Sequence, residues 1–264
     1  MKNRSVGLTL APQMGIYDRD YYRAPQRRNG LGQFDALSIT TWLVLINVGV
    51  FVLDSLLTPR SGGRWALSPR SFEDLMGPLS RWGFFSYSRA IDDLQLWRFV
   101  SFQFLHANLA HLFGNMLSLY LFGPIVESYL GRVRYLAFYL VCGVAGALSY
   151  LILFKTGHLV TYPTTPLVGA SAGIFGVLVA AAYLAPDVRV MLLWPPIPMK
   201  LRYMAIGMLG IAVYTVLRHG MNAGGEAAHI GGGVLGWAII SAQRWLSSMT
   251  RRRRMKDWTS DFDR

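Results

Sequence analysis

The sequence predicts an all-α, polytopic membrane protein built as a bundle of six transmembrane helices. Of its 264 residues, 53% are hydrophobic and 15% are charged, whereas soluble proteins carry about 25% charged residues. The apolar residues lie in long runs rather than at amphipathic spacing, which is typical of membrane spans. The expected spans are about 37–57, 107–126, 133–154, 169–185, 203–218 and 226–245.

These spans divide the chain into a membrane domain, 37–245, and two polar tails. The N-terminal tail, 1–36, is too short to build a hydrophobic core of its own. The C-terminal tail, 246–264, is strongly basic. A long outer loop, about 58–106, joins the first two spans and is rich in leucine and aromatic residues. We expect part of this loop to lie in the outer membrane interface.

The net charge of +12 is informative about topology. Six spans place both termini on one side, and that side would carry 18 of the 26 Lys and Arg residues. The positive-inside rule therefore predicts that both termini are cytoplasmic. The basic C-terminal cluster is then a topology anchor, so we expect a lipid bilayer and no nucleic acid as partner. The single cysteine, Cys142, excludes an intrachain disulfide.

A serine between small residues opens the fourth expected span. Ser171 stands in the run GASAG, which begins at Gly169. Small residues in membrane helices commonly serve close packing. Ser171 is therefore either a packing residue or a nucleophile, and the rest of the chain has to decide between the two.

His229 lies within the sixth expected span, where an ionisable group is costly and marks a functional candidate. A core histidine satisfied by a hydrogen bond is the alternative. Gly232 and Gly236 follow on roughly the same helix face and would let a neighbouring helix come very close. If that neighbour is the fourth span, Ser171 and His229 meet at similar depth. A histidine base needs this arrangement to activate a serine hydroxyl.

Further polar groups stand at the start of the second span. His111 and Asn115 are four residues apart, so they share a helix face, and both offer N–H donors. Two donors near a nucleophile suit an oxyanion hole, although hydrogen bonding between helices is an alternative use. His158 and His219 fall in outer loops, where we expect both to be solvated.

In combination and in this order, these features resemble the rhomboid family of intramembrane serine proteases. The resemblance covers about 140 residues, from Leu96 to Gly236. Its elements are Trp97-Arg98, the run of His106, His111 and Asn115, Glu127 with Gly131, Gly169-Ala170-Ser171, and Ala228-His229 with Gly232 and Gly236.

The resemblance implies that Ser171 is the nucleophile and His229 the base of a two-residue dyad. It also implies that Asn115, His111 and the Ser171 backbone N–H bind the oxyanion, with Gly169 in the same substrate-positioning group. Residues of the outer part of the chain would support the site and cover it. These are His106, Phe175, Trp97 and Arg98 as supports and the loop at about 218–226, with Met221, as a cap.

The chain departs from the family pattern at several positions near the dyad. Ala172 stands where glycine is frequent, which is a mild change. Phe175 stands where a tyrosine commonly packs on the catalytic histidine, so it can stack but offers no hydroxyl. Glu226, one turn before His229, is an acid in an unexpected place. It could favour the protonated form of the histidine, but we expect a rim residue in water.

Other hydrolase classes fit the sequence poorly. A soluble nucleophile elbow needs a strand before Ser171 and an acid between serine and histidine, where Asp187 stands at the far end of the fourth span. A metalloprotease His-Glu-x-x-His motif is absent from the sequence. An aspartyl intramembrane protease needs two membrane carboxylates, but Asp54 and Asp187 fall at span ends on opposite sides.

The sequence therefore predicts a serine-type endopeptidase that cleaves transmembrane or juxtamembrane segments of membrane proteins, without a cofactor or a metal. The expected location is a bacterial cytoplasmic membrane. A rhomboid-like protein that binds membrane clients without cutting them is the main alternative, and a transporter is a weaker one because the spans show no obvious repeat. The oligomeric state and the natural substrate stay open.

Overall fold

The structure, a computed structural model, describes residues 37–58, 76–191 and 196–262. The chain divides into two units, 1–37 and 38–264. The described helices and strands all belong to the second unit. The predicted N-terminal tail, 1–36, lies outside the described residues.

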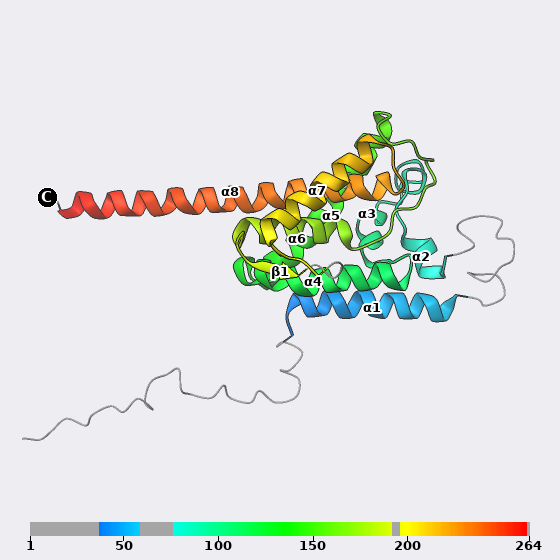
Figure 1. Ribbon diagram of the computed structural model, residues 1–264, viewed down its shortest axis with the longest axis horizontal. Coiled ribbons are helices and arrows are strands. Elements are labelled where there is room, and N and C mark those ends of the chain that lie inside the picture. The colour runs from blue at the N-terminus through cyan, green and yellow to red at the C-terminus, as the bar shows by residue number, and fades with distance from the viewer. Residues whose placement is uncertain (1–36, 59–75, 192–195, 263–264) are drawn as a thin grey trace, which may run out of the picture. The chain divides into compact units, whose positions relative to one another are not determined.

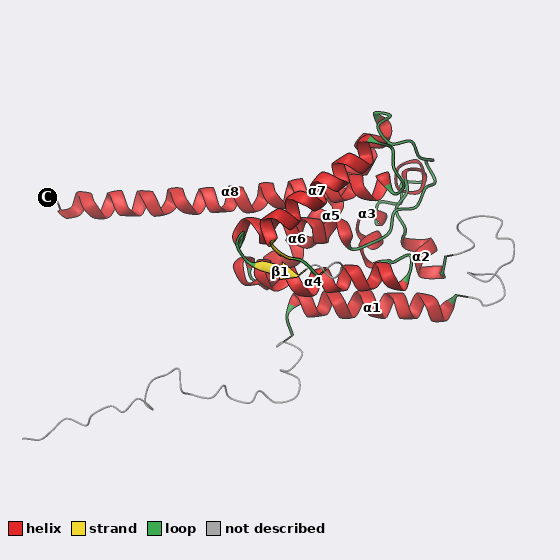
Figure 2. Ribbon diagram, in the orientation of Figure 1, coloured by secondary structure: helices red, strands yellow, loops and turns green. Residues whose placement is uncertain are grey.

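Each expected span coincides with a helix of the structure (Figures 1 and 2). Three described helices are long and apolar enough to cross a membrane, and α6 and α7 are apolar but shorter, with 14 and 17 residues. The helical class is confirmed, while the count of six crossings stays a prediction. The six helices are α1 (Ile39–Leu57), α4 (Leu109–Leu130), α5 (Arg132–Lys155), α6 (Ser171–Leu184), α7 (Leu201–Leu217) and α8 (Ala223–Phe262).

Short elements connect these helices. The described part of the long loop holds α2 (Pro78–Gly83), a π-helical turn η5 (Ser88–Asp92), α3 (Arg98–Ser101) and a 3-10 turn η6 (Phe102–Phe104). Trp82 and Trp97 stack there at 5.7 Å between ring centroids, and both are exposed. An antiparallel hairpin of β1 (Arg189–Met191) and β2 (Pro198–Lys200) lies between α6 and α7, with Arg189 opposite Lys200.

The start of α1 is tied to α4 by a buried carboxylate. Ser38 caps the helix by accepting a hydrogen bond from the Thr41 N–H at 3.0 Å. The Glu127 side chain accepts from the Ile39 N–H at 2.7 Å and from the Thr40 N–H at 3.0 Å. A negative group at the N-terminal end of a helix is favourable. Glu127 therefore satisfies donors of α1 and fixes the register of α1 against α4.

α6 is the central helix of the bundle, since ten of its 14 residues are buried and it contacts α4, α5, α7 and α8. Its contact with α8 is made by glycines. A Cβ built on Gly236 would lie 2.5 Å from the Gly176 carbonyl oxygen, and one on Gly232 would collide with the Ala172 carbonyl. The two backbones are closer than any side chain at these positions would allow.

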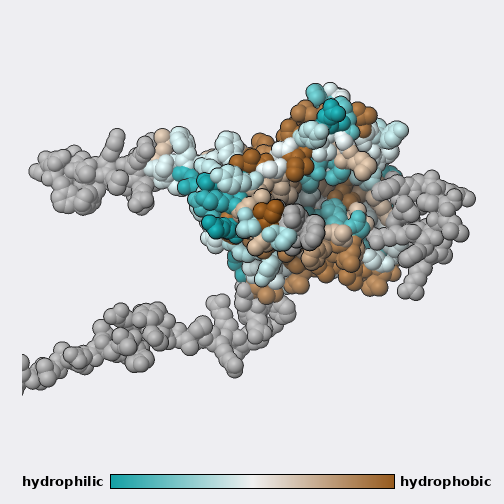
Figure 3. All heavy atoms as spheres, viewed as in Figure 1, coloured by the Kyte–Doolittle hydropathy of each residue, from teal (hydrophilic) through white to brown (hydrophobic). Residues whose placement is uncertain are grey.

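Apolar side chains cover the outer face of the helices. Figure 3 shows a hydrophobic surface over α1 and hydrophilic residues near the β1 end of the bundle. On α1 the exposed apolar residues include Leu45, Val52, Leu53 and Leu56. An apolar surface of this extent is typical of helices that face lipid.

Gly236→Ala and Gly233→Ala form a matched test of the close contact between α6 and α8. The first places a methyl group 2.5 Å from the α6 backbone, whereas the second meets only side chains, Val179 at 3.4 Å and Leu209 at 4.0 Å. We expect Gly236→Ala to lower the free energy of unfolding by about 1–3 kcal/mol, the usual cost of overpacking. Gly233→Ala should be neutral or slightly stabilising. Thermal unfolding in detergent measures both, and equal stability of the two variants would contradict the packing described here.

Candidate active site

Ser171 is the first residue of α6 and follows a strained glycine. Gly169 has a φ of +134°, which favours glycine, and its N–H donates to the Phe102 carbonyl at 3.0 Å. The first helical bond runs from the Ile174 N–H to the Ala170 carbonyl. The first N–H groups of a helix have no partner within the helix and carry partial positive charge. Ser171 therefore stands where backbone donors are available.

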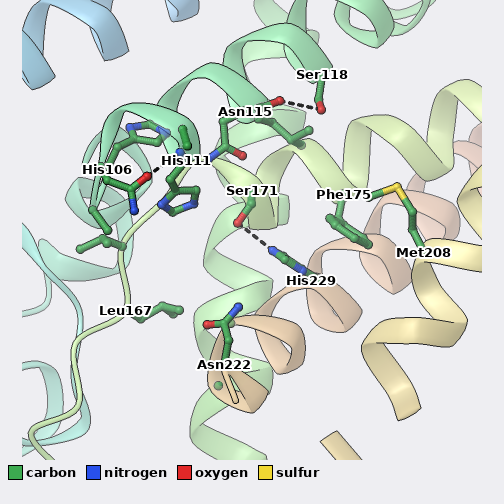
Figure 4. A pocket seen from close by; sticks show the side chains of 18 of the residues that line it. His106, His111, Asn115, Ser118, Leu167, Ser171, Phe175, Met208, Asn222 and His229 are labelled. Carbon is green, nitrogen blue, oxygen red and sulfur yellow. Dashed lines mark hydrogen bonds between the residues drawn. The ribbon is translucent and has the colours of Figure 1, made fainter. Parts of the chain in front are cut away.

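The structure brings Ser171 and His229 together. The His229 Nε2 lies 2.8 Å from the Ser171 Oγ (Figure 4). The imidazole stacks on Phe175, with ring centroids 4.1 Å apart and ring planes within 4° of each other. Phe175 therefore stacks on His229 although it lacks the hydroxyl of a tyrosine. The close approach of α8 to α6 at Gly232 is what places the two side chains at the same depth.

Glu226 is not the water-exposed rim residue that the sequence predicts. Its Oε2 lies 2.9 Å from the Nδ1 of His229, and only 20% of the Glu226 side chain and 14% of the His229 side chain are exposed. The two residues are three apart on α8, so they share a helix face. That spacing was the signal in the sequence, but spacing alone does not fix the orientation of a side chain.

His111 and Asn115 also lie beside the serine (Figure 4). A Cβ built on Gly169 would be 2.9 Å from the His111 Nε2 and 3.5 Å from the Ser171 Oγ, so the imidazole faces the serine across the glycine backbone. Asn115 is 7% exposed, and its Nδ2 has no hydrogen-bond partner among the described residues. Both side chains offer N–H donors, and both line the cavity that holds Ser171.

Ser171, His229, His111 and Asn115 line one cavity of about 1420 Å³. Polar groups of α4, α6 and α8 meet at one part of it, and apolar groups of α4 and α7, among them Leu121 and Met208, line another. Met221, in the loop that was expected to cap the site, lines the cavity and is 96% exposed. In the described parts of the chain, no three or more His, Cys, Asp or Glu side chains are grouped to hold a metal ion.

Three of the supporting residues come from the segment between α1 and α4. His106 is buried, and its ring meets that of His111 edge to face at 5.2 Å between centroids. Arg98 is buried and donates to the carbonyls of Arg81 and Phe84. Trp97 stacks on Trp82 rather than on any residue near the serine. Arg98 and Trp97 therefore stabilise the described part of the long loop between α1 and α4.

His106 makes the stability of the protein depend on pH. Burial, with a smaller contribution from the charge of His111, lowers the pKa of His106 from 6.5 to about 3. In the unfolded chain the His106 imidazole is protonated below about pH 6.5, whereas in the folded chain it stays neutral down to about pH 3. The stabilising contribution is complete above pH 6.5 and is lost as pH falls below it, at up to about 1.4 kcal/mol per pH unit.

We expect the melting temperature in detergent to fall between pH 7 and pH 5, and the fall to be smaller in His106→Phe. His158, which is exposed, provides the control, and His158→Gln should keep the wild-type pH dependence. The same decline in His106→Phe as in the wild type would contradict this assignment.

The chain is similar to several known proteins. The family model described as a rhomboid domain matches residues 93–244. Rhomboid protease AarA of Providencia stuartii is 29% identical over 220 residues, which cover 78% of this chain and 72% of AarA. Putative rhomboid protease YdcA of Bacillus subtilis is 35% identical over 94 residues, 34% of this chain and 42% of YdcA.

A plant relative aligns over a smaller part of its own length. RHOMBOID-like protein 1 of Arabidopsis thaliana is 28% identical over 150 residues, and the alignment covers 52% of this chain and 36% of that protein. The chain thus spans little more than a third of this relative. The match of the rhomboid domain covers more than half of the chain, and three described helices are long and apolar enough to cross a membrane. The chain is an integral membrane protein and belongs to the rhomboid family.

Proposed function

We propose that this protein is an intramembrane serine endopeptidase that cleaves transmembrane or juxtamembrane segments of membrane proteins. The observation that carries the proposal is the 2.8 Å hydrogen bond between the Ser171 Oγ and the His229 Nε2 in a cavity of the bundle. A serine and a histidine within hydrogen-bond distance are the minimal unit of nucleophilic acyl transfer. Membership of a family that includes proteases supports the same reaction.

In this mechanism neutral His229 takes the proton of the Ser171 hydroxyl while the oxygen attacks the carbonyl carbon of the scissile peptide bond. His229 then gives the proton to the leaving amine, and an acyl-enzyme remains on Ser171. Water, activated by the same imidazole, hydrolyses the ester and restores the serine. The cavity leaves room for that water beside the two residues.

The negative oxygen that forms during the attack needs hydrogen-bond donors. The backbone N–H of Ser171, at the start of α6, the Asn115 Nδ2 and the His111 ring are the groups we assign to it. The Asn115 Nδ2 has no partner in the part of the chain that the structure describes, which supports this assignment, because a buried donor without a partner is costly unless a ligand uses it. Preorganised donors of this kind are commonly the largest single term in catalysis.

The substrate is a segment that can leave its helical conformation, since a fully hydrogen-bonded helix hides its carbonyls. The apolar part of the cavity lies between α4 and α7 and includes Met204 and Met208. Methionine side chains adapt to different shapes. We therefore propose that this part receives apolar side chains of the substrate.

We also propose that both termini of the protein are cytoplasmic in a bacterial membrane, as the distribution of Lys and Arg predicts.

Ser171→Ala should abolish cleavage of a transmembrane substrate and leave the melting temperature unchanged, because the hydroxyl contributes to the reaction and little to packing. Labelling by a fluorophosphonate probe should be lost in the same variant and strongly reduced in His229→Ala. Cleavage retained by Ser171→Ala would refute the serine mechanism. A wild-type protein that binds membrane clients but neither cleaves them nor reacts with the probe would favour the client-binding alternative.

Asn115→Ala should lower kcat by roughly 10²–10³-fold, the usual effect of removing one oxyanion donor. KM should change little, because the charge on the oxygen develops only in the transition state. The neighbouring Ser118→Ala is the control, since the Ser118 hydroxyl lines the same cavity but donates to the Gly114 carbonyl of its own helix at 2.8 Å. An equal loss in both variants would argue against an oxyanion role for Asn115.

A further inference from the structure

We propose that Glu226 is a positioning residue for His229, so that this protein works with a serine–histidine–glutamate triad in place of a dyad. The proposal rests on the function proposed above. Its basis is a continuous line of hydrogen bonds across two helices. Glu226 Oε2 lies 2.9 Å from the His229 Nδ1, and the His229 Nε2 lies 2.8 Å from the Ser171 Oγ.

The first consequence concerns which ring nitrogen carries the proton. An ionised carboxylate can only accept hydrogen bonds, so the bond to Glu226 requires the proton on Nδ1. The Nε2 lone pair is then free to accept the hydroxyl proton of Ser171. With no acceptor at Nδ1, a neutral imidazole also populates the opposite tautomer, in which Nε2 carries the proton and cannot act as a base.

The second consequence concerns the orientation of the ring. Stacking on Phe175 fixes the plane of the imidazole but does not distinguish the ring from its 180° flip, which exchanges nitrogen and carbon positions. The hydrogen bond to Glu226 removes this ambiguity, because only one of the two flips places Nδ1 against the carboxylate. Phe175 and Glu226 together therefore define both the plane and the orientation of the base.

The third consequence concerns charge. His229 becomes a cation when it takes the serine proton, and a carboxylate at 2.9 Å stabilises that cation. Both side chains are largely shielded from water, which limits screening of the attraction.

Other titratable groups around the site do not replace this acid. From other elements, His106 and His111 on the α4 side and Tyr150 of α5 line the cavity. Asp54 is the acid that lines it within the described residues, and it accepts hydrogen bonds from Ser80 of α2. Glu226 is therefore the carboxylate in direct contact with the base.

Glu226 is itself held in place. It lies in the first turn of α8, where the helix dipole favours a negative charge, and its backbone N–H donates to the Asn222 carbonyl at 3.0 Å. A glutamate at this position could serve only to stabilise the start of the helix. That role would affect the melting temperature and leave the chemical step unchanged, so the two roles are separable by experiment.

The test compares Glu226→Gln, Glu226→Ala and Glu226→Asp in the full-length protein with a transmembrane substrate in lipid vesicles. We expect kcat to fall by up to roughly 10⁴-fold in the Gln and Ala variants, the effect of losing the orienting acid of a triad, with KM within about twofold of the wild type. Glu226→Asp should recover part of the loss, because it keeps the charge and the acceptor. Asp187→Asn, at an exposed carboxylate of the β1–β2 end, is the control for loss of one negative charge.

The split between kcat and KM, together with the rescue by Glu226→Asp, gives a readout that helix stabilisation does not move. Wild-type kcat in Glu226→Gln and Glu226→Ala would overturn the triad, even with cleavage abolished in Ser171→Ala. A fall in kcat that merely follows a fall in melting temperature, with Asp no better than Ala, would overturn it too. Cleavage retained in Ser171→Ala would instead overturn the serine mechanism itself.

Discussion

The contact between the backbones of α6 and α8 is the constraint on which the rest of the structure depends. Gly232 and Gly236 lie against Ala172 and Gly176, so the two helix axes come closer than larger residues would permit. In a membrane, helices gain little from the hydrophobic effect, and close packing has to supply the association. The same contact sets the depth of His229 relative to Ser171. The packing of the bundle and the meeting of Ser171 with His229 thus depend on the same glycines, Gly176, Gly232 and Gly236.

Polar groups in this bundle are arranged in two ways. Glu127, Asp54 and Arg98 bind backbone N–H or carbonyl groups of neighbouring elements, so their hydrogen-bonding capacity is used within the structure. Around the serine the situation differs, since the Asn115 amide and both nitrogens of His106 have no partner among the described residues. Unpaired buried polar groups cost stability, and those that line a cavity can complete their bonds with substrate or water.

Much of the fold was accessible from the sequence because hydropathy acts over long runs. All six apolar segments became helices, and the small residues around Ser171 and His229 correctly indicated buried, closely packed helices. The C-terminal end of α8 could not be predicted from hydropathy. Hydropathy places the edge of the membrane near residue 245, but the arginines that follow are good helix formers, and the helix continues to Phe262.

Part of the candidate site could also be predicted from the sequence. Spacing along a helix indicated that His111 and Asn115 share a face, and the glycines suggested which helices meet. The bond between Glu226 and His229 depends on side-chain torsions and on the local exclusion of water, which one sequence does not encode in a readable pattern. A charged residue at the end of a span is commonly solvated, and that general tendency led to the wrong expectation for Glu226.

The length of α8 has a consequence for what surrounds the protein. A helix of 40 residues extends about 60 Å at 1.5 Å per residue, whereas the hydrocarbon layer is about 30 Å thick. Even a strongly tilted helix of that length projects from the hydrocarbon layer by several turns. The C-terminal turns of α8 therefore extend beyond the lipid tails, while its other end holds His229.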